Sequence, residues 1–227
     1  MASRRARPGK LHLFLAAAPG AGKTYALLAE GRRRAALGAD VVIGLAETHG
    51  RADTKAQVRD LEAIPQRRVP YRGTAFDELD VPAVLARNPR VVLVDELAHS
   101  VIPGGRHDKR WQDVEELLEA GIDVVSALNV QHLESMAEMA GKLTGVAVGE
   151  TVPDAFTGAA DRVDLLDVDP ETLRARIARL YPPSTAKRAL TGYFRPQNLA
   201  ALAALGRRWI REHGFGPTAS QSSGAAG

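Results

Sequence analysis

The stretch Ala17-Ala18-Pro19-Gly20-Ala21-Gly22-Lys23-Thr24 decides the fold of this chain. It follows an apolar run at residues 11–16 and precedes a helix-like stretch that starts at Thr24. Strand, glycine-rich turn, Gly-Lys-Thr and helix, in that order, are the layout of a phosphate-binding loop. One position departs from the common form, because Ala17 replaces the leading glycine. The sequence predicts a strand–loop–helix unit that binds a nucleotide.

The residue types in this loop have chemical reasons. Gly20 and Gly22 let backbone N–H groups approach phosphate oxygens, and the helix N-terminus adds the positive end of its dipole. Lys23 is expected to reach the β- and γ-phosphates, and the Thr24 hydroxyl to bind Mg²⁺. The alternative is a glycine-rich turn whose lysine is merely solvated. The predicted nucleotide-binding residues of the loop are Pro19, Gly20, Ala21, Gly22, Lys23, Thr24 and Tyr25.

A second motif, which is acidic, follows another apolar run. Residues 91–94 read Val-Val-Leu-Val, without polar alternation, which is typical of a central strand buried on both faces. The strand ends in Asp95-Glu96, which fits a Walker B position. We expect Asp95 to hold Mg²⁺ together with Thr24, and Glu96 to be the catalytic general base that polarises water. The alternative is an acidic pair that only caps the next loop.

Polar residues also follow two other predicted strands, at residues 41–46 and 122–128. In open parallel sheets, ligands bind at the carboxyl ends of the strands. We therefore expect Asn129 and Gln131 to contact the γ-phosphate or orient water, although such residues often only satisfy backbone groups. The other polar residues expected at this edge are Glu47, His49, Arg51 and His132.

Alternating apolar runs and helix-like stretches predict an α/β, P-loop-type three-layer fold with a mostly parallel sheet and a small helical C-terminal extension. Further short strands are predicted near residues 67–71 and 163–168. The predicted helices cover residues 23–37, 54–63, 81–87, 111–120, 133–144, 184–194 and 198–210. The predicted organisation is a disordered basic lead-in at 1–10, a nucleotide-binding domain at 11–168, a helical extension packed on the core at 169–213, and a disordered tail at 214–227.

Composition narrows the classes of function. The 227 residues carry a formal net charge of +3 and contain no cysteine, which excludes disulfides and thiolate chemistry. No apolar run approaches the roughly 20 residues that span a bilayer, so we expect a soluble, cytoplasmic protein that reaches a membrane only through a partner. Basic residues are dispersed, and no nucleic-acid partner is expected. The spacing of His49, His99, His107 and His132 fits no structural zinc pattern.

The long Gly/Pro segment at residues 97–110 is predicted to act as a lid or to supply a charge-stabilising arginine. The alternative is a solvated basic loop.

Several stretches together resemble the N-terminal cytoplasmic domain of the KdpD family of osmosensitive potassium-channel sensor histidine kinases. The resemblance spans roughly residues 9–210, and the strings that carry it include Pro19–Tyr25, Glu47–Arg51, Asp95–His99, Lys109–Asp113, Asn129–Ser135 and Glu150–Asp154.

The resemblance implies an ATP-binding regulatory domain that takes part in sensing potassium or osmotic state. Such a domain adjusts the balance between kinase and phosphatase activities toward a response regulator. It also implies ATP and Mg²⁺ as cofactors, with Gly20, Gly22, Lys23 and Thr24 in the loop and Asp95 as the Walker B acid.

Departures from the family's pattern lie close to the predicted site. Ala16 stands where the family usually has glycine, and residues 100–102 replace its usual Thr/Ser-Asn-Ala. The family's universal-stress-like domain, four membrane helices and kinase core are not encoded here, so the expected partner is a histidine kinase core or other sensor component acting in trans. Met1 and the low-complexity tail favour a natural short protein over an excised domain.

Two other functions stay open at this point. One is a P-loop ATPase or small-molecule kinase, which the Asp95-Glu96 pair favours. The other is a protein-interaction module without nucleotide binding, which Ala16 and Ala17 suggest. The residues do not choose between ATP and GTP, and they leave open the oligomeric state and whether K⁺ binds here.

Overall fold

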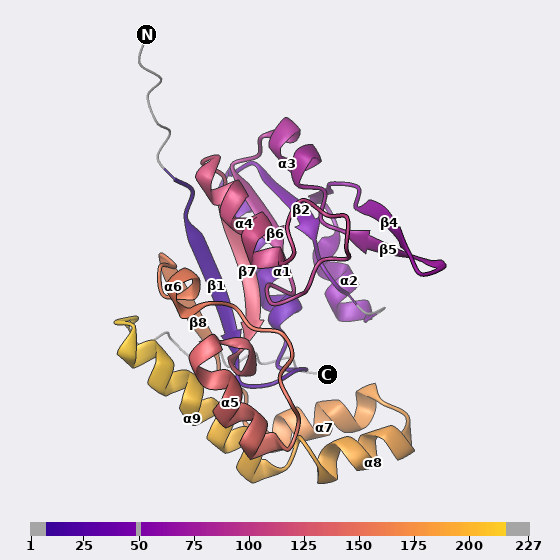
Figure 1. The fold of residues 1–227 in the computed structure, drawn as a ribbon, viewed down its shortest axis with the longest axis vertical. Helices are drawn as coiled ribbons and strands as arrows, with labels where there is room; N and C mark the ends of the chain where they lie inside the picture. The colour runs from indigo at the N-terminus through magenta and orange to yellow at the C-terminus, as the bar shows by residue number, and fades with distance from the viewer. Residues whose placement is uncertain (1–7, 49–50, 217–227) are drawn as a thin grey trace. The chain divides into compact units, whose positions relative to one another are not determined.

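The computed structural model describes residues 8–48 and 51–216, and its core is a six-stranded parallel sheet (Figure 1). The strand order is β3-β2-β6-β7-β1-β8. Its members are β1 (Leu11–Ala16), β2 (Val41–Leu45), β3 (Glu62–Ala63), β6 (Val91–Val94), β7 (Asp123–Asn129) and β8 (Arg162–Leu166). A separate antiparallel hairpin is formed by β4 (Arg67–Tyr71) and β5 (Thr74–Glu78).

Helices alternate with these strands and then end the described chain. The first group comprises α1 (Lys23–Ala36), α2 (Ala52–Val58), α3 (Val81–Arg87), α4 (Arg110–Glu119), the 3-10 turn η1 (Val130–His132) and α5 (Glu134–Thr144). The second comprises α6 (Asp154–Thr157), α7 (Pro170–Leu180), α8 (Pro183–Thr191) and α9 (Pro196–Glu212). This architecture confirms the α/β class and the C-terminal helices that the sequence predicts.

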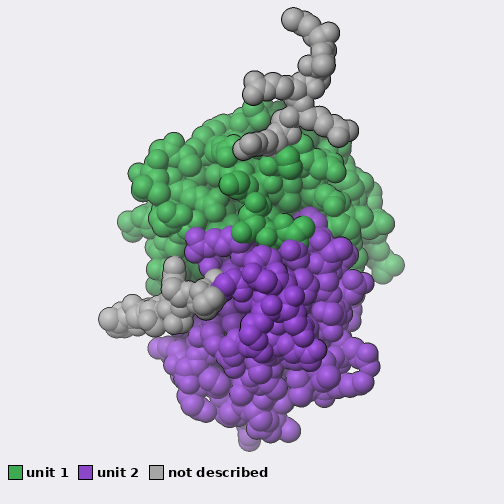
Figure 2. Space-filling model, turned by 90° about the vertical axis from the view of Figure 1, so that its left-hand side faces the viewer, with its two compact units in different colours: residues 1–13, 24–127, 159–161 green, residues 14–23, 128–158, 162–227 purple. Residues whose placement is uncertain are grey.

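The chain divides into two compact units, coloured separately in Figure 2. Unit 1 comprises residues 1–13, 24–127 and 159–161, and unit 2 comprises residues 14–23, 128–158 and 162–227.

In unit 1, buried apolar strands explain the sheet. Every residue of β6 is buried, and β6 pairs in parallel with β2 on one side and with β7 on the other. A β-carbon on Gly31 of α1 would lie 2.4 Å from Cδ1 of Leu93, so α1 packs directly on β6 and needs glycine at that point. Gly9, near the start of the described residues, is already attached to the fold, because its N–H donates a hydrogen bond to the Leu118 carbonyl.

In unit 2, the C-terminal helices enclose a second apolar core. Figure 1 shows α7 and α8 side by side, and α5 alongside α9. The core cluster contains the loop residues Ala17 and Ala18 and the buried side chains Ala140, Leu173, Ile177, Phe194, Leu199, Leu202 and Ala203. Residues just after β1 are therefore packed against helices that follow more than 150 residues later.

Several local predictions were wrong. The helix predicted at 54–63 ends at Val58, because Arg59 leaves the helical conformation and Glu62–Ala63 pairs with β2 as a short edge strand. Strand β5 and helix α7 were missed. The start signals of α7 were present, since Asp169 accepts a hydrogen bond from the Thr172 N–H and Pro170 occupies the first turn.

Candidate phosphate loop and its acidic partner

The loop between β1 and α1 has the backbone conformation that its glycines predict. Gly20 has φ of 84° and Gly22 has φ of 92°, a region that side chains disfavour. Ala21 is buried, Pro19 is half-buried, and Tyr25 is 42% exposed. Glycine is thus required at two positions of the loop by geometry alone.

In unit 2, Lys23 reaches the end of β7. Its Nζ donates a hydrogen bond of 2.8 Å to Oδ1 of Asn129, which is only 7% exposed. The sheet order places β7 between β1, which leads into the loop, and β6, which leads to Asp95. The predicted residues Lys23 and Asn129 are therefore brought together by the fold.

Gln131 follows Asn129 by two residues and is contacted by Tyr193, which lies in the turn between α8 and α9. Its side-chain carbonyl oxygen accepts a hydrogen bond from the hydroxyl of Tyr193. Burial raises the pKa of Tyr193, so this hydroxyl stays protonated and remains a donor at neutral pH. Tyr193 orients the Gln131 amide, a role that sequence reasoning missed because 62 residues separate the two side chains.

In unit 1, the side chains of Thr24 and Asp95 are in contact. The Thr24 hydroxyl donates a hydrogen bond of 2.6 Å to Oδ2 of Asp95, which is fully buried. The other carboxylate oxygen accepts from the Glu96 N–H at 2.9 Å, and the Asp95 N–H donates to the Leu45 carbonyl at 3.0 Å. A hydroxyl and a carboxylate are the oxygen ligands that Mg²⁺ prefers, so the chemistry of this pair fits a magnesium ion.

Glu96 has an unusual backbone conformation. Its φ is 54°, in the left-handed region that costs energy for a residue with a side chain. Its carbonyl accepts a hydrogen bond of 3.4 Å from Nη1 of Arg110, and its side chain is half-buried. The backbone of Glu96 is thus held by Asp95 and Arg110.

Arg110 belongs to a buried charge cluster around Glu78. Its Nη2 lies 2.7 Å from Oε2 of Glu78, and the two side chains are 4% and 3% exposed. Burial by itself raises the pKa of Glu78, but hydrogen bonds from His99, the charge of Arg110 and the Ile102 N–H outweigh it and lower that pKa to about 2. Glu78 is therefore a carboxylate at neutral pH, and sequence reasoning missed it.

The segment 97–110, which the sequence predicts to act as a lid, is held in its conformation by hydrogen bonds between its own residues. The Val101 N–H donates to the Asp108 carbonyl, and Lys109 Nζ donates to the Ser100 hydroxyl at 2.7 Å. Arg106, a candidate for charge stabilisation, is paired with Glu116 on α4.

The other residues expected at the sheet edge differ in their contacts. His132 touches a predicted site residue, since its Nε2 lies 3.3 Å from Nε2 of Gln131. Glu47 is exposed, and Nδ1 of His132 lies 2.8 Å from the Glu150 carbonyl. His49 lies outside the described residues, while Arg51 only precedes α2. Within residues 8–48 and 51–216, no group of three His, Asp or Glu side chains could hold a metal ion.

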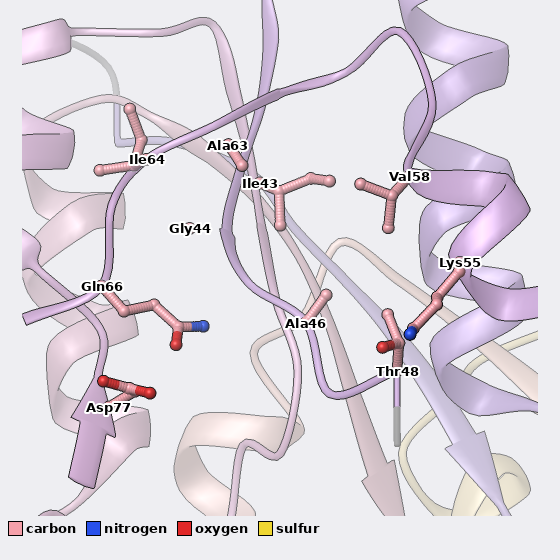
Figure 3. A pocket seen from close by; sticks show the side chains of 10 residues that line it. All are labelled: Ile43, Gly44, Ala46, Thr48, Lys55, Val58, Ala63, Ile64, Gln66 and Asp77. Carbon is pink, nitrogen blue, oxygen red and sulfur yellow. The ribbon is translucent and has the colours of Figure 1, made fainter. Parts of the chain in front are cut away.

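A cavity of about 610 Å³ lies in unit 1, at the carboxyl end of β2. Figure 3 shows Thr48 and Lys55 on one side of it, and Gln66 and Asp77 on the other. The remaining lining residues are Ile43, Gly44, Ala46, Val58, Ala63 and Ile64. It contains none of the predicted nucleotide-binding residues, and its size suits a small molecule.

In the part of the chain that is described, no helix is both long and apolar enough to cross a bilayer.

Comparison with known proteins gives consistent matches. The family model described as "KdpD: Osmosensitive K+ channel His kinase sensor domain" matches residues 7–213. The chain is 49% identical over 206 residues to the sensor protein KdpD of Mycobacterium tuberculosis (strain ATCC 25618 / H37Rv), which covers 90% of this chain and 24% of that protein. It is 52% identical over 202 residues to the sensor protein KdpD of Escherichia coli (strain K12), covering 88% and 23%.

A third relative is shorter. The putative sensor protein KdpD of Synechocystis sp. (strain ATCC 27184 / PCC 6803 / Kazusa) is 47% identical over 206 residues, covering 90% of this chain and 56% of that protein. The chain thus spans about a quarter of the length of the first two relatives and about half of the third. The matched family model, which covers nearly the whole chain, and these identities show that the chain belongs to the KdpD family of osmosensitive K⁺ channel His kinase sensor domains.

Proposed function

We propose that the chain binds Mg-ATP at the loop 17–24 and thereby regulates a potassium-sensing histidine kinase/phosphatase whose catalytic core lies outside this sequence. The observation that carries the proposal is the hydrogen bond between Lys23 Nζ and Asn129 Oδ1. It holds the lysine of a Gly-Lys-Thr loop beside the end of the strand where a γ-phosphate sensor is expected. The description of the family as a His kinase sensor domain supports the regulatory part of the proposal.

Each remaining residue has a role in this proposal. The N–H groups around Gly20 and Gly22 would donate hydrogen bonds to phosphate oxygens, and Thr24 with Asp95 would hold Mg²⁺. When bound, Mg²⁺ neutralises phosphate charge. Asn129, with Gln131 held by Tyr193, reports whether a terminal phosphate is present. The nucleotide acts as a conformational signal, with turnover slow or absent.

Replacing Lys23 by alanine is expected to weaken Mg-ATP binding at least about 100-fold, because a positive charge at the phosphates is lost. Calorimetric titration of Mg-ATP into the wild type and the variant measures this, with released phosphate followed in parallel. Lys187→Ala on α8, which removes an exposed lysine, is the matched control and should bind like the wild type. Absence of ATP binding by the wild type would contradict the proposal and select the protein-interaction module.

A second function, a P-loop ATPase or small-molecule kinase, is favoured by the cavity at the end of β2. An acceptor molecule in that cavity would lie against β2. The last residue of β2, Leu45, is hydrogen-bonded to Asp95, because its carbonyl accepts from the Asp95 N–H. In such an enzyme, Glu96 is the general base.

Glu96→Gln then decides between the two functions. In an enzyme, this change is expected to lower multiple-turnover phosphate release about 100-fold while leaving Mg-ATP affinity within about twofold, since general bases contribute 10²–10⁴-fold. Asp77→Asn in the cavity is a useful comparison, because it would raise the KM for an acceptor without lowering basal hydrolysis. Negligible turnover in the wild type would leave the regulatory function as the better account.

A further inference from the structure

Helix α7 lies directly against the phosphate loop. A β-carbon on Gly20 would lie 3.0 Å from Cδ1 of Ile177 and 3.4 Å from Cδ1 of Leu173. These two side chains are only 1% and 2% exposed, and they belong to the same core cluster as Ala17 and Ala18. The loop and α7 are therefore packed together within unit 2.

Arg176 lies on the same side of α7 as this contact. It follows Leu173 by three residues, a spacing that keeps two side chains on one helix face. A β-carbon on Gly22 would lie 3.9 Å from Nη1 of Arg176, the nearest side-chain atom to that position. The guanidinium group is thus beside the glycine that precedes Lys23.

The charge of Arg176 has no partner in the part of the chain that the structure describes. Its side chain makes no hydrogen bond or ion pair there, although it is half-buried. Arg174 on the same helix differs, since its Nη1 donates to the Leu190 carbonyl at 2.9 Å and also to the Phe194 carbonyl.

The groups around Arg176 favour the binding of an anion next to its guanidinium group. The loop 17–24 contains no carboxylate, and Nζ of Lys23 donates a hydrogen bond to the neutral side-chain amide of Asn129. The backbone N–H groups of the loop and the N-terminus of α1 add positive potential at the same place. A half-buried arginine in such a place is stabilised by an oxyanion partner, and two phosphate oxygens suit the planar fork of donors of its guanidinium group.

We propose that Arg176 donates hydrogen bonds to the phosphates of the nucleotide bound at the loop. This inference rests on the proposed function, and it adds a phosphate-binding residue from the C-terminal helices. Because α7 packs on α8 and α9, a phosphate held by Arg176 connects the nucleotide to the whole C-terminal helical segment. That segment is the part of unit 2 through which nucleotide state can be passed to a partner.

The test compares Arg176→Gln with the wild type in titrations of Mg-ATP and of Mg-tripolyphosphate. Glutamine keeps part of the aliphatic stem and removes the charge. We expect both ligands to bind at least about tenfold more weakly, by the same factor, because the contact is to phosphate. Arg176→Lys should recover part of the loss, since lysine keeps the charge without the fork of donors. Arg179→Gln, an exposed arginine of the same helix, is the control.

An independent readout is the Nε–H resonance of Arg176 in an NMR spectrum, assigned by its disappearance in the Arg176→Gln variant. Saturating Mg-ATP is expected to shift it. Wild-type affinity in Arg176→Gln, with loss of binding in Lys23→Ala, would overturn this inference and leave the proposed function intact. Loss of affinity for ATP but not for tripolyphosphate would place Arg176 at the base or ribose and would also overturn it. Absence of binding to the wild type would overturn both.

Discussion

Replacing Arg110 by methionine is expected to lower the free energy of unfolding by about 3–5 kcal/mol. Methionine fills most of the volume but removes the arginine charge that pairs with the Glu78 carboxylate, which is 3% exposed and keeps its contacts with His99 and the Ile102 N–H. An uncompensated buried charge is among the most costly single changes in a protein. Nε of Arg110 is itself buried and has no hydrogen-bond partner among the described residues, so the cost arises mainly from the carboxylate left behind. Urea unfolding followed by circular dichroism measures the effect.

Two further variants give this prediction its controls. Arg162→Met breaks an ion pair of similar length with Asp164, but Arg162 is 56% exposed, and we expect a loss below about 1 kcal/mol. Adding Glu78→Gln to Arg110→Met should recover part of the stability, because neither position of the former ion pair then carries a charge. Equal losses in the free energy of unfolding for Arg110→Met and Arg162→Met would show that the buried ion pair contributes no more to stability than the exposed one.

The same cluster predicts how stability depends on pH. The pKa of Glu78 is about 2 in the fold, below the ordinary value of a glutamate, so the folded state favours the ionised form. Its contribution is fully present above about pH 4.5 and is lost as the pH falls toward 2, and it amounts to about 3 kcal/mol. Glu78→Gln should remove this part of the acid dependence. An unchanged slope between pH 4.5 and 2 in that variant would contradict it.

Replacing Trp209 by alanine is expected to cost about 3–5 kcal/mol, because it removes the largest fully buried side chain of the described chain. Trp209 stands on α9, and its indole N–H donates a hydrogen bond of 2.7 Å to Oδ1 of Asp154. Its ring stacks on His213 with centroids 4.2 Å apart. The change therefore leaves a cavity in unit 2 and an unpaired acceptor. Thermal unfolding followed by far-UV circular dichroism measures the loss.

The control for this prediction keeps an aromatic ring. Trp209→Phe retains most of the buried area but loses the donor to Asp154, and we expect about half the loss of Trp209→Ala. Leu180→Ala removes a side chain that is 41% exposed and should cost less than about 1 kcal/mol. A loss in Trp209→Ala no larger than in Leu180→Ala would mean that α9 contributes little to the stability of unit 2.

The candidate site shows both the strength and the limit of sequence reasoning. Residues 11–24 predicted a strand, a loop and a helix from local pattern, and the strand, the helix and the positive φ of Gly20 and Gly22 agree with it. The meeting of Lys23 with Asn129, and of Thr24 with Asp95, follows from the rule that parallel strands end at one edge. ATP and Mg²⁺ binding at these residues stays a prediction.

The missed residues share one property, which is distance along the chain. Glu78 and Arg110 are 32 residues apart, Gln131 and Tyr193 are 62 residues apart, and Arg176 lies more than 150 residues after Gly22. No periodicity or local motif connects such pairs, because they meet only when separate elements pack. The helix-like pattern at residues 54–63 also led to a wrong prediction, because the helix ends at Val58 and Glu62–Ala63 pairs with β2.

The sequence by itself determined the parallel α/β class, the glycine-rich loop, the acidic strand end and, through long matching strings, the family. These are local properties, set by backbone conformation and by the burial of short apolar runs. Only the tertiary structure decided which helix covers the loop and which charge beside it lacks a partner among the described residues. Packing of α7 on the loop depends on side-chain shapes from distant segments, and the position of Arg176 follows from that packing.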